Sequence, residues 1–214
     1  MLPTLTTNQR QKLEEEIAVL SRDLPASCRT EFRDVETPEK LFERVNELRV
    51  REAFKKRLYS IQRGKDFLHD KIQTEKTPDW FAQKESLEFL VEVASVQLSQ
   101  ALHQRVNAGY EHGVDDRSDI GSIVLKKVTK YKEITKEAHL PLVVCIVPNI
   151  HKYIDEQDIC ASLKDWHAFD LDVNPSSEYL SAVICMWHKF PSGSTFGEIH
   201  NPNAKYPICC NFTH

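Results

Sequence analysis

Two acidic residues stand at a spacing that could bind a divalent metal ion. Asp79 follows Pro78, and Glu92 opens the triplet Glu92-Val93-Ala94. If the segments that carry them form a hairpin turning near residue 85, the two carboxylates become near cross-strand neighbours. Two carboxylates at so short a distance repel one another unless a cation lies between them. Mg²⁺ or Mn²⁺ suits the pair, and the backbone carbonyl of Val93 could supply a third ligand.

A lysine would complete this chemistry. A metal ion can lower the pKa of a bound water, and an ammonium can orient that water and offset the charge on a phosphate. Ala94 occupies the place two residues after Glu92 where such a lysine is expected. Lys127 is the candidate substitute, because it lies within the apolar stripe of a later helix, and Lys130 is the runner-up.

A third acid could assist the metal or its water. Glu52 extends one apolar stripe of a long helix, where a carboxylate is costly unless it has a partner. Glu43 and Glu47 lie on the same helix and are alternatives to Glu52.

The elements that must position these residues follow from hydrophobic periodicity and capping signals. Helices are predicted over residues 7–22, 37–64, 118–138 and 154–166. Strands are predicted over residues 65–73, 77–83, 86–95, 140–148 and 179–187. The long second helix is either buried on two sides or bent near residue 49, while residues 23–37 and the tail from residue 197 are predicted as loop. Helices before, between and after the strands predict an α/β sandwich around a mixed sheet.

Length and composition bound the class of protein. The chain has 214 residues, 41% of them hydrophobic, which suits one sizeable core. No apolar run approaches the ~20 residues of a membrane helix, and the first residues lack the apolar stretch of a signal peptide. The six cysteines show no Cys-x-x-Cys pair, and three stand in apolar surroundings. We therefore expect a soluble cytoplasmic protein with reduced cysteines and no membrane partner.

Charge is unevenly distributed along the chain. The net charge is −4, yet residues 40–65 hold nine Lys and Arg against three Glu, and residues 121–136 hold five Lys against one Glu. If these stretches fold side by side, they form one basic face in an acidic protein. The residues expected to hold a phosphate backbone are Lys55, Lys56, Arg57, Lys126 and Lys130.

On these motifs the chain resembles the PD-(D/E)XK nuclease superfamily. The matching features are Pro78-Asp79, Glu92-Val93-Ala94, a leading helix with an acid, and Lys127-Val-Thr-Lys-Tyr131 at the spacing of a Gln-x-x-x-Tyr motif. The back half is also similar to a group of uncharacterised bacterial proteins. The resemblance implies a restriction-endonuclease-like three-layer sandwich over residues 37–214, with residues 1–36 as an N-terminal helical extension.

The resemblance also implies a function. The chain would be a metal-dependent nuclease that hydrolyses phosphodiester bonds of DNA or RNA, in a host-defence or mobile-element setting. Asp79, Glu92 and Val93 would bind Mg²⁺ or Mn²⁺, while Glu52 and Lys127 would serve catalysis. A protein partner or a homo-oligomer would bring the substrate, because the chain is acidic outside its two basic stretches. The alternative is an inactive module of the same fold that binds nucleic acid or a partner protein.

Overall fold

The computed structural model of the chain describes residues 6–33, 35, 37–69, 72, 76–96, 117–148, 156–189, 193–208 and 212. The helices are α1 (Thr7–Leu20), α2 (Ala26–Arg33), α3 (Pro38–Lys56), α4 (Gly64–Leu68), α6 (Arg117–Ala138), α7 (Glu156–Asp165) and the 3-10 helix η1 (Pro175–Tyr179). The strands are β1 (Ser60–Arg63), β2 (Trp80–Lys84), β3 (Leu87–Val96), β4 (Leu142–Pro148), β5 (Leu180–Lys189) and β6 (Gly193–His200).

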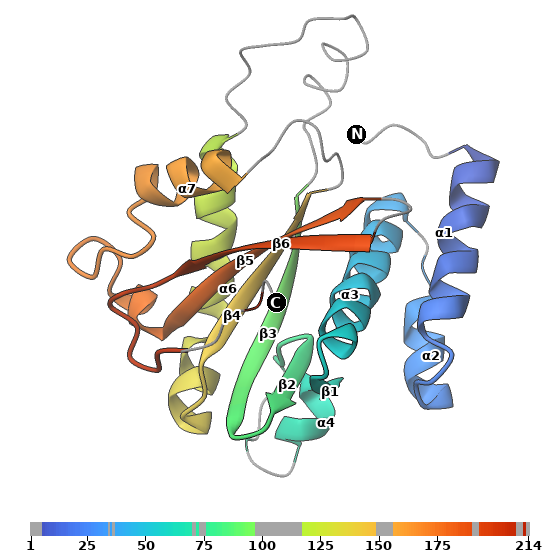
Figure 1. Ribbon diagram of the computed structural model, residues 1–214, viewed down its shortest axis with the longest axis horizontal. Helices are drawn as coiled ribbons and strands as arrows, with labels where there is room; N and C mark the ends of the chain where they lie inside the picture. The colour runs from blue at the N-terminus through green and yellow to red at the C-terminus, as the bar shows by residue number, and fades with distance from the viewer. Residues whose placement is uncertain are drawn as a thin grey trace, which may run out of the picture.

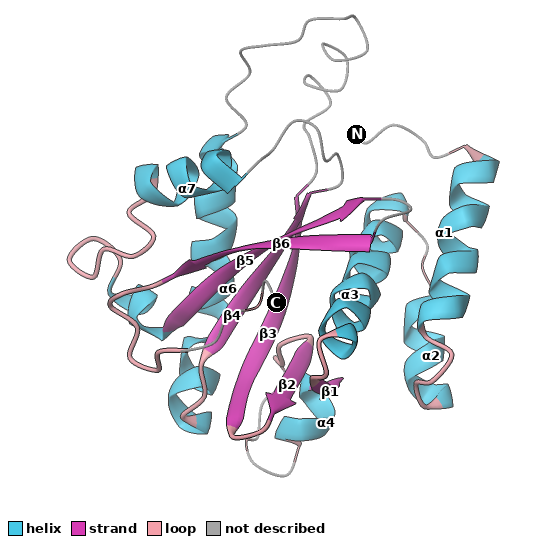
Figure 2. Ribbon diagram, viewed as in Figure 1, coloured by secondary structure: helices cyan, strands magenta, loops and turns pink. Residues whose placement is uncertain are grey.

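The strands form one six-stranded mixed sheet in the order β1-β2-β3-β4-β5-β6 (Figure 1). Strands β1, β2 and β3 form an antiparallel meander. The pairs β3–β4 and β4–β5 are parallel, and β6 returns antiparallel to β5. Helix α3 covers one face of the sheet and α6 the other (Figure 2). The predicted α/β three-layer sandwich is confirmed.

The alternation of β3 explains why both faces are covered. Phe89 and Val91 point into the core that α3 completes, whereas Leu90 and Ala94 point into the core beneath α6. Strand β4 is buried along its whole length, as expected for a parallel strand covered on both sides. Glu92 has the same parity as Leu90 and Ala94, so its carboxylate is directed toward α6.

Helix α3 is one continuous helix between two layers, so the alternative of two helices that meet near residue 49 is wrong. Thr37 caps its first turn, with Pro38 at the first helical position. It packs against β3 on one side and α1 on the other, which explains its two apolar stripes. The helix ends at Lys56, earlier than predicted, and Leu58 adopts a left-handed conformation at φ 66° just before β1.

Three local predictions are wrong. The described part of the predicted strand 65–73 is not a strand: Ser60–Arg63 form β1, and Gly64–Leu68 form the short helix α4. The connector 23–37 contains α2, and part of the tail is paired in β6. The elements missed are short or lie at an edge of the sheet, where half-exposed residues give a weak apolar pattern.

The two N-terminal helices pack on the outer side of α3. Ile17 of α1 and Phe32 of α2 belong to the same apolar core as Trp80 of β2. The rings of Phe32 and Trp80 are parallel, with 6.1 Å between their centroids. Residues of the predicted extension therefore share the core that α3 forms with the sheet.

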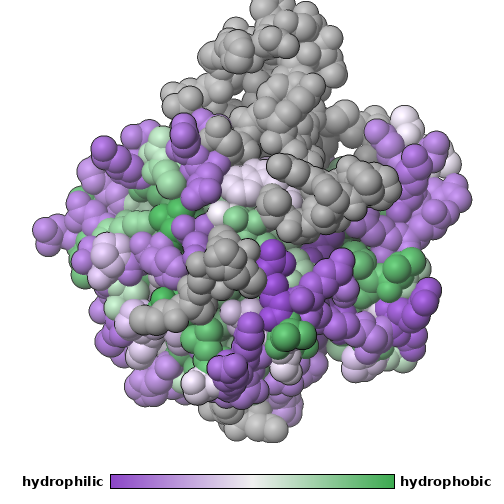
Figure 3. Space-filling model, in the orientation of Figure 1, coloured by the Kyte–Doolittle hydropathy of each residue, from purple (hydrophilic) through white to green (hydrophobic). Residues whose placement is uncertain are grey.

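The described surface is mostly hydrophilic on the face shown in Figure 3, and apolar side chains of described residues form scattered patches there. Among the described helices, none is both long enough and apolar enough to cross a bilayer. Cys28, Cys145 and Cys185 are buried and free of disulfides, whereas Cys160 is exposed.

Candidate active site

Asp79 and Glu92 come together at the point where β2 begins. Trp80 pairs with Val91 across the two strands, so Asp79 and Glu92 occupy the next positions along the ladder. Asp79 Oδ2 accepts a hydrogen bond of 2.8 Å from the backbone N–H of Val93. The structure thus places both predicted acids in one cleft, at the beginning of one strand and the middle of its neighbour.

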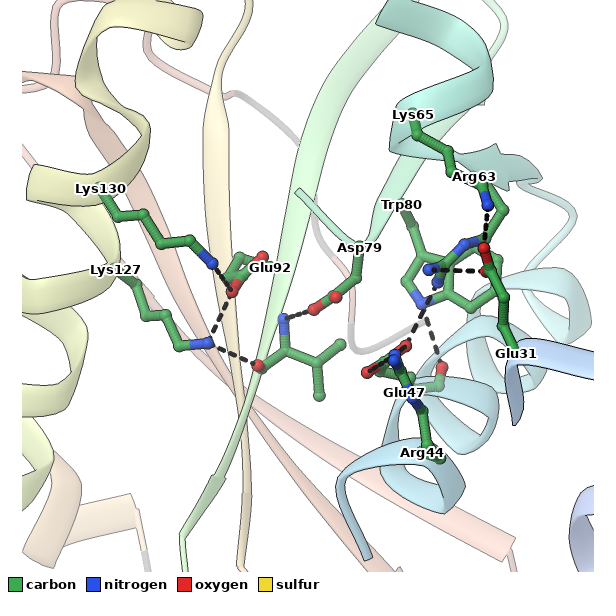
Figure 4. Close-up of polar contacts among 11 residues, drawn as sticks. Glu31, Arg44, Glu47, Arg63, Lys65, Asp79, Trp80, Glu92, Lys127 and Lys130 are labelled. Carbon is green, nitrogen blue, oxygen red and sulfur yellow. Dashed lines mark hydrogen bonds and ion pairs between the residues drawn. The ribbon is translucent and has the colours of Figure 1, made fainter. Parts of the chain in front are cut away.

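Lys127 reaches this cleft from α6 (Figure 4). Its Nζ lies 2.6 Å from Glu92 Oε1 and 3.5 Å from the carbonyl oxygen of Val93. Lys130, one turn further along α6, lies 4.0 Å from the same Glu92 oxygen. The lysine that the sequence offers in place of Ala94 therefore enters this cleft from the helix across the sheet face.

The electrostatics of this pair follow from burial. The Glu92 side chain is only 2% exposed. Loss of hydration and then the charge of Asp79 raise the pKa of Glu92 to about 7, against the opposing effect of Lys127. Burial disfavours the charged ammonium of Lys127, but the charge of Glu92 and the hydrogen bond to it outweigh burial and raise the pKa of Lys127. The two groups therefore stabilise each other's charged forms.

The cleft has a volume of about 420 Å³ and two walls of opposite charge. Carboxylates from α3, β3 and the start of β2 form one wall, and lysines of α6 form the other. Its lining residues are Glu43, Glu47, Asp79, Glu92, Val93, Ala94, Ser95, Ile123, Lys126, Lys127 and Lys130. A larger hollow of about 570 Å³ against α7 shares none of these residues.

Glu52 does not line this cleft. Among the described residues its charged partner is Lys55, with Nζ 3.9 Å from Glu52 Oε2 on the same helix. Glu43 and Glu47, the two alternatives on this helix, line the cleft instead. Each helical residue turns the side-chain direction by about 100°, so Glu52 lies about 140° around α3 from Glu47.

Glu47 is held by arginines that the sequence did not connect with the site. Arg44 Nη1 donates to both Glu47 carboxylate oxygens, at 2.9 and 3.1 Å, and Arg63 Nη1 donates to Oε2 at 3.2 Å. Burial and then the charge of Asp79 nevertheless raise the pKa of Glu47 to about 8. The pair Arg44 and Glu47 is visible in the sequence as an i, i+3 spacing, but nothing there points to Arg63.

The two groups of predicted phosphate-binding residues separate in the structure. Lys126 and Lys130 line the cleft beside Lys127. Lys55, Lys56 and Arg57 do not. Lys55 pairs with Asp23, while Arg57 lies over the ring of Phe196 and donates to the Phe212 carbonyl oxygen. The two basic stretches therefore do not combine into one basic lining of this cleft.

Within the described residues, no three Asp, Glu, His or Cys side chains gather closely enough to hold a metal ion by themselves. On its strand side the cleft offers the carboxylates of Asp79 and Glu92 and the carbonyl of Val93, and the Lys127 ammonium contacts the last two of these groups. The cleft therefore holds the buried acid Glu92, whose charge Lys127 balances, next to Asp79, which accepts a hydrogen bond from the backbone.

Comparisons with known proteins give no family for this chain. No family model matches it, and no curated protein matches it. Among solved structures, the chain is weakly similar to SfsA of Pyrococcus furiosus in complex with Ca²⁺, with a TM-score of 0.33 and 13% identity. The match covers 76% of this chain and 62% of that chain, so it spans less than two thirds of the matched structure.

Proposed function

We propose that the chain is a metal-dependent nuclease whose active site is the cleft between β3 and α6. One observation carries the proposal. Glu92 Oε2 is buried and has no hydrogen-bond donor in good geometry among the described residues, while Oε1 is held by Lys127 and the Tyr131 hydroxyl lies close enough to interact with the carboxylate. A buried carboxylate with a free oxygen is costly unless a proton or a cation satisfies it.

The available oxygens suit a hard divalent cation. Asp79, Glu92 and the Val93 carbonyl would supply ligands, and Mg²⁺ completes such a set with water. Bound there, the ion would stabilise negative charge on a phosphate and make a bound water more acidic. These residues lie on one strand and at the start of its neighbour, so the ladder between them would maintain their spacing.

The lysines would act on the substrate. Lys126 and Lys130 are close enough to the acids to attract a phosphodiester into the cleft, in spite of the acidic net charge of the chain. Lys127 would orient the attacking water, because its ammonium is fixed between Glu92 and the Val93 carbonyl. Glu47, which lines the opposite wall, replaces Glu52 as the acid that would assist this water.

A second candidate is an inactive module of the same fold that binds nucleic acid or a partner protein. The observation that favours it is the same Lys127 contact, because the ammonium already neutralises the carboxylate that a metal would use. In that case Lys127 would replace the metal ion rather than assist it.

Cleavage and metal binding separate the two candidates. Purified protein would be incubated with single- and double-stranded DNA and RNA in Mg²⁺, Mn²⁺ or EDTA, and Mn²⁺ binding would be measured by calorimetry. The nuclease requires cleavage in metal that is lost in Asp79→Asn and Glu92→Gln. Glu88→Gln is the matched control, because Glu88 lies on the same strand but outside the cleft, hydrogen-bonded to Gln83. Binding of nucleic acid with neither cleavage nor Mn²⁺ uptake would establish the inactive module instead.

A further inference from the structure

Glu47 is fixed from two sides at the edge of the cleft. Arg44 comes from the preceding turn of α3, and its side chain is 34% exposed. Arg63, the last residue of β1, is 11% exposed and reaches the other side of the carboxylate. The indole N–H of Trp80 also donates to the backbone oxygen of Glu47, at 3.1 Å. Of the two arginines, Arg63 is the more buried and comes from another element, so it is the partner that ties Glu47 to the sheet.

Arg63 is in turn held by α2 (Figure 4). Its Nη2 lies 3.7 Å from Glu31 Oε2, and Lys65 pairs with the same glutamate. The guanidinium lies 5.1 Å from the ring centroid of Phe32 and 4.8 Å from that of Trp80. Aromatic rings hold a nearby guanidinium more firmly than an ammonium, because the planar group can lie against their faces. The position of Arg63 therefore depends on two consecutive residues of the second N-terminal helix.

We infer that Arg63 is a positioning residue for Glu47, and that α2 sets the place of this carboxylate in the cleft through Glu31 and Phe32. The inference rests on the proposed function in one respect, namely that catalysis uses Glu47. Without Arg63, the Glu47 side chain would keep Arg44 as its charged partner among the described residues, and Arg44 is partly exposed and one turn away on the same helix. The side chain would then follow Arg44 toward water, because nothing from β1 would hold it against the sheet.

The chain offers a matched control for this role. Arg51 is 6% exposed, lies over the same Trp80 ring at 5.9 Å, and pairs with Asp23 in the N-terminal region. Its guanidinium bonds the two Asp23 oxygens at 2.9 and 2.8 Å rather than the carboxylate of Glu47. Arg51→Met therefore removes another buried, paired arginine over the Trp80 ring without removing a bond to Glu47.

The experiment combines crystal structures with cleavage kinetics in Mg²⁺. In Arg63→Met we expect the Glu47 carboxylate to leave the cleft and kcat to fall by about 10- to 100-fold, with KM for the oligonucleotide nearly unchanged. Arg63→Lys should recover only part of this loss, because an ammonium has no planar face to lie against an aromatic ring and no pair of parallel N–H donors for a carboxylate. Arg51→Met should lower the Tm but leave both the Glu47 position and kcat as they are.

Two results would overturn the inference: an unmoved Glu47 carboxylate in Arg63→Met, or the same loss of kcat in Arg51→Met. If Arg63→Met does not fold, Glu31→Gln replaces it. Glu31 is 39% exposed, so the fold should tolerate the change, and Glu47 should still shift while kcat falls by a smaller factor. If the wild-type protein cleaves nothing, the proposed function fails, whereas the crystal structures still decide whether Arg63 positions Glu47.

Discussion

Replacement of Lys127 by methionine tests the charge balance of the cleft most directly. Methionine keeps an apolar chain packed along α6 but removes the ammonium that lies 2.6 Å from Glu92 Oε1. Glu92 is then left with Lys130, at 4.0 Å and 43% exposed, as its remaining cationic neighbour in the cleft. The loss in stability should depend on pH, because Glu92 can compensate by taking up a proton.

The magnitude follows from the pKa of Glu92. In the wild type this pKa is raised to about 7, so near pH 6 the carboxyl is mostly protonated with or without Lys127. Without Lys127 the pKa rises further, and above about pH 7 the folded variant holds a proton that the folded wild type has lost. Each pH unit in this range costs the variant about 1.4 kcal/mol relative to the wild type. Near pH 9 the difference should reach about 3 kcal/mol, similar to the cost of removing one partner from a buried ion pair.

The assay is urea unfolding of the wild type and Lys127→Met at several pH values between about 6 and 9. The difference in the free energy of unfolding should be small at the acidic end and should grow steadily above neutrality. Lys130→Met is the matched control, and its effect should stay small throughout because Lys130 is farther from Glu92 and more exposed. A difference for Lys127→Met that does not change with pH would refute the argument.

Three further predictions concern the support of the cleft. Gly64→Ala should lower the Tm by several degrees in calorimetry, because a Cβ at Gly64 would lie 2.1 Å from the Pro78 carbonyl oxygen; an unchanged Tm would contradict this packing. The hydrogen bond from Arg51 holds the pKa of the Asp23 carboxyl well below its usual range. The stability lost in Asp23→Asn, measured by urea unfolding, should therefore shrink as the pH falls below about 4. A loss that is independent of pH would argue against that pairing. Ala94→Lys combined with Lys127→Met should cleave oligonucleotides in Mg²⁺ faster than Lys127→Met alone, because Ala94 also lines the cleft; equal rates would contradict an interchangeable lysine.

The strongest sequence patterns predicted the centre of the fold. Continuous apolar runs indicated the strands β4 and β5, which are buried on both faces, and the alternation of apolar residues with glutamates indicated β3. Strand β3 is nevertheless covered on both faces, because its second face also carries Leu90 and Ala94. The first strand was predicted a few residues too late in the chain, because the side chains of β1 alternate between exposed and half-buried and give little apolar contrast. The edge strand β6 lies in a segment with the Gly and Asn composition of a loop, and only its pairing with β5 identifies it.

The candidate site was predictable where it depends on local pairing. Asp79 and Glu92 belong to one hairpin. The apolar stripe that contains Lys127 indicated which face of α6 meets the sheet, and hence that this lysine could reach the acids. The helical acid was not predictable in the same way. Because α3 is buried on two sides, periodicity does not tell which side faces the cleft, so Glu52 was preferred over Glu47. Arg63 depends on tertiary contacts with α2 that no spacing in the sequence shows.

The order of the strands has a consequence for how the cleft assembles during folding. Strands β2 and β3 are joined by a tight turn, whereas Leu90 of β3 pairs with Leu142 of β4 only after a long stretch of chain has been closed into a loop. Local pairings form faster than distant ones. We expect the hairpin with Asp79 and Glu92 to form before α6 delivers Lys127. The folding chain would then pass through a stage with two adjacent acids and no ammonium, so its rate should rise when protons or divalent ions neutralise them.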